Sequence, residues 1–193
     1  MIKSCLLCGV GGQGTVLASR LIALSGMENG YNVRTAETIG MAQRGGCVVS
    51  HVRYGDEEIH SPLIYEGMAD VIIAFEPAEA VRCIRYLKKD GAVIVNSKAV
   101  KPVTATLSNS SYDGSEMLEY LRSNVKNLTV IDGEKICEEC GSSKVLNIAL
   151  LAGAANSGSL GIDVDGLKKA IKSKIPEKFH SLNLKAVELV TEK

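Results

Sequence analysis

The chain has no excess of charge of either sign and no long apolar run. Lysine plus arginine and aspartate plus glutamate each number 22 among the 193 residues, so no overall field attracts nucleic acid or an anionic membrane. The longest apolar stretch, residues 145–155, contains Asn147 and is shorter than the roughly 20 residues of a membrane span. The N-terminus reaches a glycine-rich run too soon for a signal peptide. We expect a cytoplasmic globular protein without nucleic-acid or membrane partners.

The six cysteines do not form a spacing pattern typical of a disulfide framework or a four-cysteine cluster. Cys5 and Cys8 lie three residues apart in a predicted strand, so their side chains should point to opposite faces. Cys137 and Cys140 have the same spacing on a predicted helix and should share one face, as half a zinc site, an exposed dithiol or a strained disulfide. Without a second pair of ligands, these two remain weak metal candidates and we predict no metal site.

Short apolar strands alternate with helices along the chain. Strands are predicted at residues 2–8, 31–36, 47–54, 71–75, 92–95 and 128–131. The first helix should bury Leu17, Leu21 and Leu24 and end at Asn29-Gly30. Further helices are predicted at 76–89, 134–140 and 145–156, and two more begin near Asp165, as a cap, and Pro176, the last carrying Phe179 on its apolar face. Residues 97–115 are predicted as a surface loop.

One predicted strand shows strict alternation. Val48, Ser50, Val52 and Tyr54 lie on one face of it, and Gly55-Asp56 could turn the chain into a return strand at residues 59–64. The whole pattern predicts one domain over residues 1–193. Its fold class is α/β, with a doubly wound, mostly parallel sheet in a three-layer αβα sandwich and a small antiparallel excursion.

The run Gly9-Val10-Gly11-Gly12-Gln13-Gly14 joins the first predicted strand to the first predicted helix. Glycines in such a turn leave backbone N–H groups facing one spot, where an anion or a polar group of a partner can bind. The spacing also matches a dinucleotide fingerprint, with Glu37 near the position of the ribose-binding acid. A tight turn that serves packing alone is the alternative.

A longer set of motifs resembles one family, the beta subunits of indolepyruvate ferredoxin oxidoreductase, which correspond to the gamma domain of 2-oxoacid ferredoxin oxidoreductases. The motifs are residues 9–14, 37–46, 49–55, 61–64, 69–70, 75–77 and 79–82, followed by Val95-Asn96, Asn147, residues 176–179 and residues 183–186. Within the family, Gly40-Met41-Ala42-Gln43-Arg44-Gly45-Gly46 is similar to the arylpyruvate branch.

The resemblance implies a subunit that is inactive alone and carries no catalytic residue. A large alpha subunit would hold thiamine diphosphate, Mg²⁺ and [4Fe–4S] clusters, and the complex would convert a 2-oxoacid and coenzyme A to acyl-CoA and CO₂ while reducing ferredoxin. A second copy of the chain is a further candidate partner. The subunit would close part of the active-site cleft. The residues expected to face partner or cofactor are Gly11, Gly12, Gln13, Gly14, Met41, Gln43, Arg44, Gly45 and Gly46.

Arg44 is the first candidate for a functional side chain, because its guanidinium can donate two or three charge-assisted hydrogen bonds to a carboxylate or phosphate, at about 1.5–3 kcal/mol each. An internal ion pair with Glu37 or Asp70 is the alternative. His51 shares a strand face with Val49 and is interpreted as a structural histidine. Two other function classes stay open at this point, an NAD(P)-binding Rossmann dehydrogenase and a thiol- or metal-based regulatory module.

Overall fold

The computed structural model describes residues 1–37, 46–101 and 112–192, and a six-stranded sheet forms its centre. The strands are β1 (Ile2–Val10), β2 (Asn32–Glu37), β3 (Cys47–Gly55), β4 (Ala69–Ala74), β5 (Leu87–Asn96) and β6 (Asn127–Ile131). They lie in the order β2-β3-β1-β4-β5-β6. Within the described sheet, β3 alone runs opposite to the other strands: it pairs antiparallel with β1 and β2, while β1, β4, β5 and β6 pair in parallel.

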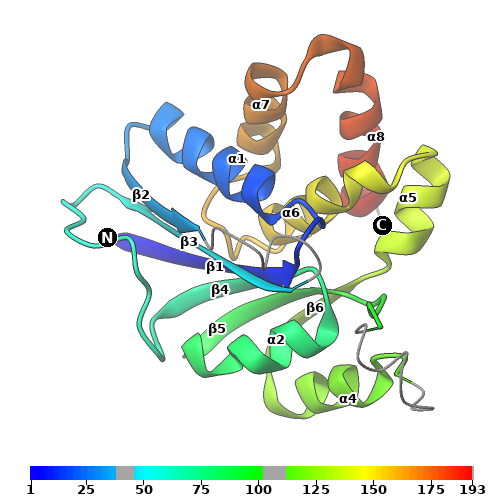
Figure 1. Ribbon diagram of the computed structural model, residues 1–193. Coiled ribbons are helices and arrows are strands. Elements are labelled where there is room, and N and C mark those ends of the chain that lie inside the picture. The colour runs from blue at the N-terminus through cyan, green and yellow to red at the C-terminus, as the bar shows by residue number, and fades with distance from the viewer. Residues whose placement is uncertain (38–45, 102–111, 193) are drawn as a thin grey trace.

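Helices cover both faces of the sheet (Figure 1). One face carries α1 (Thr15–Glu28), α6 (Leu146–Asn156), α7 (Val164–Lys174) and α8 (His180–Thr191), with α5 (Gly133–Cys140) beside α6 and α8. The other face carries α2 (Pro77–Cys83) and α4 (Ser115–Asn124). Short 3-10 turns occur at η2 (Ile84–Tyr86), η3 (Ser143–Val145) and η4 (Glu177–Phe179). The three-layer αβα fold predicted from the alternation is confirmed. None of the helices in the described ranges is long and apolar enough to cross a bilayer.

The central strands are apolar on both sides because helices cover both faces. In β4 and β5, Val71, Ile73 and Ile94 belong to the core beneath α1 and α6, whereas Ile72 and Val93 belong to the core beneath α2 and α4. α6 is buried along nearly its whole length, which explains its continuous apolar sequence.

The predicted hairpin is wrong. Residues 59–64 form no strand, although Ile59 and Ile64 are buried. The reason is that β3 already pairs on one side with β1 and on the other with β2, so it has no free edge for a third partner. The antiparallel strand of this fold is therefore β3, which lies inside the sheet between β2 and β1.

Three helix predictions also need correction. The helix predicted at 76–89 ends at Cys83, and after η2 the chain already enters β5 at Leu87. Asp163, not Asp165, caps α7, since its carboxylate accepts a hydrogen bond from Gly166 N at 2.7 Å. Leu17 and Phe179 were expected to face the core but are 36% and 41% exposed. Residues 102–111 of the predicted loop lie outside the described ranges.

Candidate functional site

The glycine turn, residues 9–14, lies at the carboxyl end of β1. The carboxyl ends of β4 and β5 lie along the same edge of the sheet. Gly12 and Gly14 have φ angles of 101° and 91°, which L side chains rarely adopt. A side chain at Gly9 would also collide, because its Cβ would lie 2.8 Å from both Gln13 Oε1 and Phe75 Cβ. The glycines are thus required by the backbone path and by close packing.

Gln13 ties this turn to two strands. Its Oε1 accepts a hydrogen bond from Val10 N at 2.7 Å, and its Nε2 donates to Phe75 O at 3.1 Å. Phe75 N in turn donates to Cys8 O at 2.8 Å. The amide of Gln13 is consequently engaged inside the protein at both ends, and its role in facing a partner remains a prediction.

Among the described residues, no side chain caps the N-terminus of α1. Its N-cap is Gly14, which has no side chain to accept a hydrogen bond from the first turn, and that turn contains no acidic residue. The N–H groups of this first turn, which have no partner among the described residues, and the positive end of the helix dipole lie beside a pocket of about 360 Å³, which is lined by Gly11, Gly12, Gly14, Thr15, Val16, Val48 and Ser50. Such a pocket suits an anion or a carbonyl group of a partner.

The described residues on either side of the segment 38–45, Glu37 and Gly46, lie beside this pocket. β2 ends at Glu37 and β3 begins at Cys47, both at the edge where β1 ends, because Val10 pairs with Cys47 and Glu37 with Ser50. Gly46 O accepts a hydrogen bond from Gly11 N at 2.8 Å. Four predicted site residues, Met41, Gln43, Arg44 and Gly45, lie outside the described residues.

A buried polar network continues from the glycine turn along the same edge. Asn96, at the end of β5, donates from Nδ2 to Phe75 O at 3.2 Å and accepts from Gly133 N, the first residue of α5, at 3.2 Å. Phe75 O thus joins the glycine turn to β5 and α5. The Phe75-Glu76-Pro77 and Val95-Asn96 motifs were part of the family resemblance, but their contact could not be read from their separation in sequence.

Glu76 is the second buried polar group of this edge, with 2% exposure. Its Oε2 accepts a hydrogen bond from Glu79 N and so caps α2, while Oε1 accepts from the Tyr112 hydroxyl. Burial, together with the hydrogen bond to Glu76, raises the pKa of Tyr112 above its usual value. Tyr112 was missed because its partner lies far away in the sequence.

The thiols behave mainly as packing groups. Cys5 and Cys8 point to opposite faces of β1, as predicted, since they belong to different cores. Cys8 Sγ donates a hydrogen bond to Glu79 O at 3.5 Å, and interaction with the Cys8 thiol lowers the pKa of Cys83. Cys137 and Cys140 are both half-buried and pack against the α6 side of the core. Across the described residues, no three His, Cys, Asp or Glu side chains lie close enough to hold a metal ion.

His51, Glu37 and Asp70 have partners within the fold. His51 Nδ1 accepts a hydrogen bond from Ile64 N at 3.2 Å, and burial lowers its pKa, in agreement with the structural role predicted for it. Glu37 accepts from Ser19 Oγ of α1 at 2.7 Å. Asp70 lies at the amino end of β4, far along the strand from the glycine turn, and pairs with Lys88 at 2.7 Å.

The topology disfavours the dinucleotide interpretation. In a Rossmann fold the acid that binds ribose ends the strand next to β1. Here β3 lies between β1 and β2, which moves Glu37 two strand spacings away from β1, roughly 10 Å.

Comparison with known proteins decides the family. The sequence matches the model of the family described as pyruvate ferredoxin/flavodoxin oxidoreductase over residues 4–193. The chain belongs to this family. An indolepyruvate oxidoreductase subunit IorB from Archaeoglobus fulgidus is 39% identical over 182 residues, with 94% of this chain and 90% of that protein covered. The corresponding subunit from Pyrococcus horikoshii is 34% identical over 186 residues, with 95% and 92% covered. The family predicted from the motifs is confirmed, and with it a subunit of a 2-oxoacid:ferredoxin oxidoreductase.

Solved structures of this oxidoreductase family share the fold. The gamma subunit of a keto/oxoacid ferredoxin oxidoreductase from Geobacter sulfurreducens matches with a TM-score of 0.71 at 23% identity, with 98% of this chain and 96% of that chain covered. A 2-oxoglutarate:ferredoxin oxidoreductase from Magnetococcus marinus has the same TM-score at 18% identity, and the match covers 99% of this chain but 31% of that longer one.

Proposed function

We propose that the chain, as one domain over residues 1–193, completes the active-site cleft of a 2-oxoacid:ferredoxin oxidoreductase whose chemistry takes place on a larger partner subunit. The partner would hold thiamine diphosphate, Mg²⁺ and [4Fe–4S] clusters, and the complex would use coenzyme A and ferredoxin. Those groups supply decarboxylation, acyl transfer and electron transfer. The cysteines of this chain do not suit a cluster, since Cys5 and Cys8 face opposite cores.

The observation that carries the proposal is the open N-terminus of α1 beside the anchored ends of β2 and β3. Gly12 is exposed, and the pocket below it is lined by backbone and small side chains. A partner's backbone or a bound anion can therefore approach the unpaired N–H groups closely. The described contacts of Gln13, Asn96 and Glu76 hold this edge rigid, which suits a surface that must exclude water from a neighbouring reaction site.

The substrate we propose is an arylpyruvate such as indolepyruvate. The motif at residues 40–46 favours that branch. Identity to relatives agrees in direction, at 39% to the Archaeoglobus fulgidus IorB protein against 29% to a pyruvate/ketoisovalerate oxidoreductase gamma subunit from Pyrococcus abyssi.

Reconstitution tests the proposal. The tagged chain should co-purify with a large iron–sulfur subunit, and only the mixture should oxidise indolepyruvate with coenzyme A while it reduces ferredoxin. Each subunit alone is the control. Turnover by the isolated chain, or reduction of NAD by it, would contradict the subunit role. A strong preference of the complex for pyruvate would contradict only the substrate branch.

Arg44→Ala provides a sharper test within the complex. Loss of charge-assisted hydrogen bonds to a substrate, cofactor or partner should lower kcat/KM by about tenfold or more. Arg44→Lys should recover only part of this, because lysine lacks the planar fork of donors. Arg122→Ala on the exposed face of α4 is the matched control. Equal activity of the Arg44→Ala and control variants would remove Arg44 from the site.

A further inference from the structure

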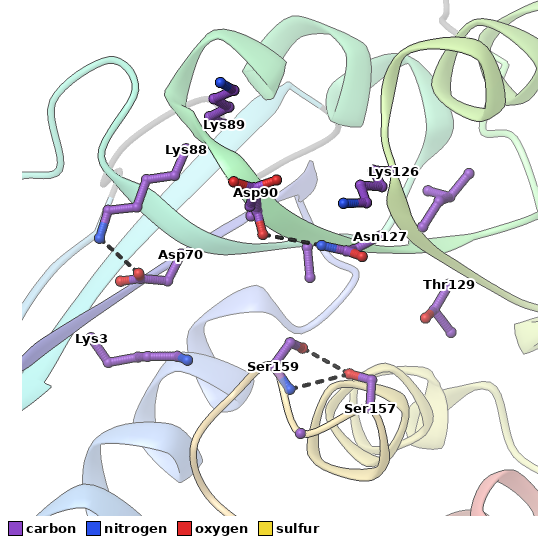
Figure 2. A pocket seen from close by; sticks show the side chains of 14 residues that line it. Lys3, Asp70, Lys88, Lys89, Asp90, Lys126, Asn127, Thr129, Ser157 and Ser159 are labelled. Carbon is purple, nitrogen blue, oxygen red and sulfur yellow. Dashed lines mark hydrogen bonds and ion pairs between the residues drawn. The ribbon is translucent and has the colours of Figure 1, made fainter.

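A large hollow of the described surface lies at the opposite edge of the sheet from the glycine turn. This amino-edge cleft has a volume of about 950 Å³ and lies between the amino ends of β1, β4, β5 and β6 and the turn that follows α6 (Figure 2). The proposed docking of the glycine turn leaves it without a function. Its chemistry is therefore a separate question.

Positive charge exceeds negative charge in this cleft, although the whole chain is balanced. Four lysines line it, Lys3, Lys88, Lys89 and Lys126, against Asp70 and Asp90. Asp70 is neutralised, since one carboxylate oxygen pairs with Lys88 at 2.7 Å and the other accepts from Ser4 N at 2.7 Å.

Two ammonium groups remain available to a ligand. Within the described ranges, neither Lys3 nor Lys126 has a hydrogen-bond or ion-pair partner. Lys3 shares its strand face with Cys5, so it projects toward the α6 side, and in Figure 2 its side chain extends toward Ser159. Lys126 lies on the strand side of the hollow, whereas Lys89 points away from it. The two available cations thus flank the cleft from opposite sides.

Hydroxyl groups line the floor between these cations. Thr129 shares the α6-facing side of β6 with Ile131 and points toward Ser157. Ser157 and Ser159 hydrogen bond to one another at 2.8 Å. Ser157 Oγ also donates to Ala154 O at 3.0 Å, and Ser159 Oγ lies 3.3 Å from the same carbonyl, so both serine hydroxyl protons are engaged within the turn. The Thr129 hydroxyl remains as a neutral donor in the cleft between the two flanking positive charges.

The spacing indicates the shape of the ligand. Lys3 is on β1 and Lys126 immediately precedes β6, with β4 and β5 between them, so three strand spacings, roughly 14 Å, separate their backbones. A single small ion would not reach both ammonium groups well, but an elongated anion would. Lysine binds phosphate as a point charge without the directional fork of arginine, and no arginine lines this cleft.

We propose that the amino-edge cleft binds an elongated phosphorylated anion between Lys3 and Lys126. Inorganic tripolyphosphate is a suitable probe, titrated calorimetrically into the full chain at constant ionic strength. Saturable binding at one site per chain is expected. The double variant Lys3→Gln/Lys126→Gln should weaken it at least tenfold, while Lys169→Gln/Lys172→Gln, which removes two exposed charges from α7, should leave it unchanged. Sulfate at the same ionic strength should not displace the probe.

Asp90→Asn provides a test of opposite sign. Asp90 is exposed and lines the cleft, and its backbone carbonyl accepts a hydrogen bond from Asn127 Nδ2 at 3.1 Å, which the substitution leaves in place. Removal of that negative charge should strengthen tripolyphosphate binding several-fold. Absence of saturable binding to the native chain would overturn the proposal. So would equal losses in the two lysine double variants, displacement by sulfate, or unchanged affinity in Asp90→Asn.

Discussion

Replacement of Gln13 by alanine should destabilise the protein although Gln13 is only half-buried. Its amide makes hydrogen bonds of 2.7 Å to Val10 N and 3.1 Å to Phe75 O. A typical hydrogen bond contributes about 0.5–1.5 kcal/mol net, so the two together are worth about 1–3 kcal/mol. Phe75 O keeps its bond from Asn96 Nδ2, whereas Val10 N loses its acceptor. We therefore expect a loss of about 1–2 kcal/mol in the free energy of unfolding.

Urea denaturation followed by circular dichroism measures this change. The midpoint should fall without a change in the slope m, since the substitution alters stability rather than the surface exposed on unfolding. Asn124→Ala is the matched control, because it also removes a side-chain amide and one bond, to Tyr120 O, but on the exposed surface of α4. It should stay within about 0.5 kcal/mol of the native chain. If Gln13→Ala lost no more than this control, the amide would not hold the turn.

Three further substitutions test other parts of the fold. Gly9→Ala should cost about 1–3 kcal/mol by overpacking, since its Cβ would lie 2.8 Å from Phe75 Cβ; a denaturation midpoint equal to that of the native chain would contradict the close approach. Tyr54→Phe should cost about 1 kcal/mol, because the buried hydroxyl donates to Leu160 O and ties β3 to the segment after α6; an equal melting temperature would argue against that bond. Burial lowers the pKa of His51 in the folded state, so the unfolded chain binds the proton more readily and stability should fall as the pH drops below about 6.5. His51→Gln should reduce this slope, His60→Gln serves as the exposed control, and the same pH profile in all three proteins would refute the assignment.

Local signals in the sequence were enough to predict most elements but not all their partners. The alternation of Val48, Ser50, Val52 and Tyr54 correctly identified the buried face of β3. It could not tell which strands lie beside β3, because alternation reports faces and not neighbours. Gly55-Asp56 suggested the nearest partner, yet β3 pairs with β1 and β2. Likewise, the helical spacing of apolar residues continues past Cys83. The helix ends there because the chain has to reach the amino edge of the sheet, where β5 begins at Leu87.

The candidate site also has one part that the sequence predicts and one part that depends on the order of the strands. The strand, glycine turn and helix at residues 2–28 could be predicted because they are consecutive. The hydrogen bond from Gln13 Nε2 to Phe75 O joins residues 62 positions apart, and the bond from Gly133 N to Asn96 Oδ1 joins residues 37 apart. Glu76 and Tyr112 also meet only through the fold. Such contacts depend on the order of the strands, which propensity and spacing do not specify.

Hydrogen exchange of the chain, free and in complex with its catalytic partner, tests the central claim most directly. The N–H groups at the start of α1, which have no partner among the described residues, exchange readily when they face solvent. Docking of this edge should slow exchange at residues 14–16 by at least tenfold, while Lys126 and Asn127 at the opposite edge keep their free rates. Unchanged exchange at the glycine turn in a catalytically active complex would contradict the account.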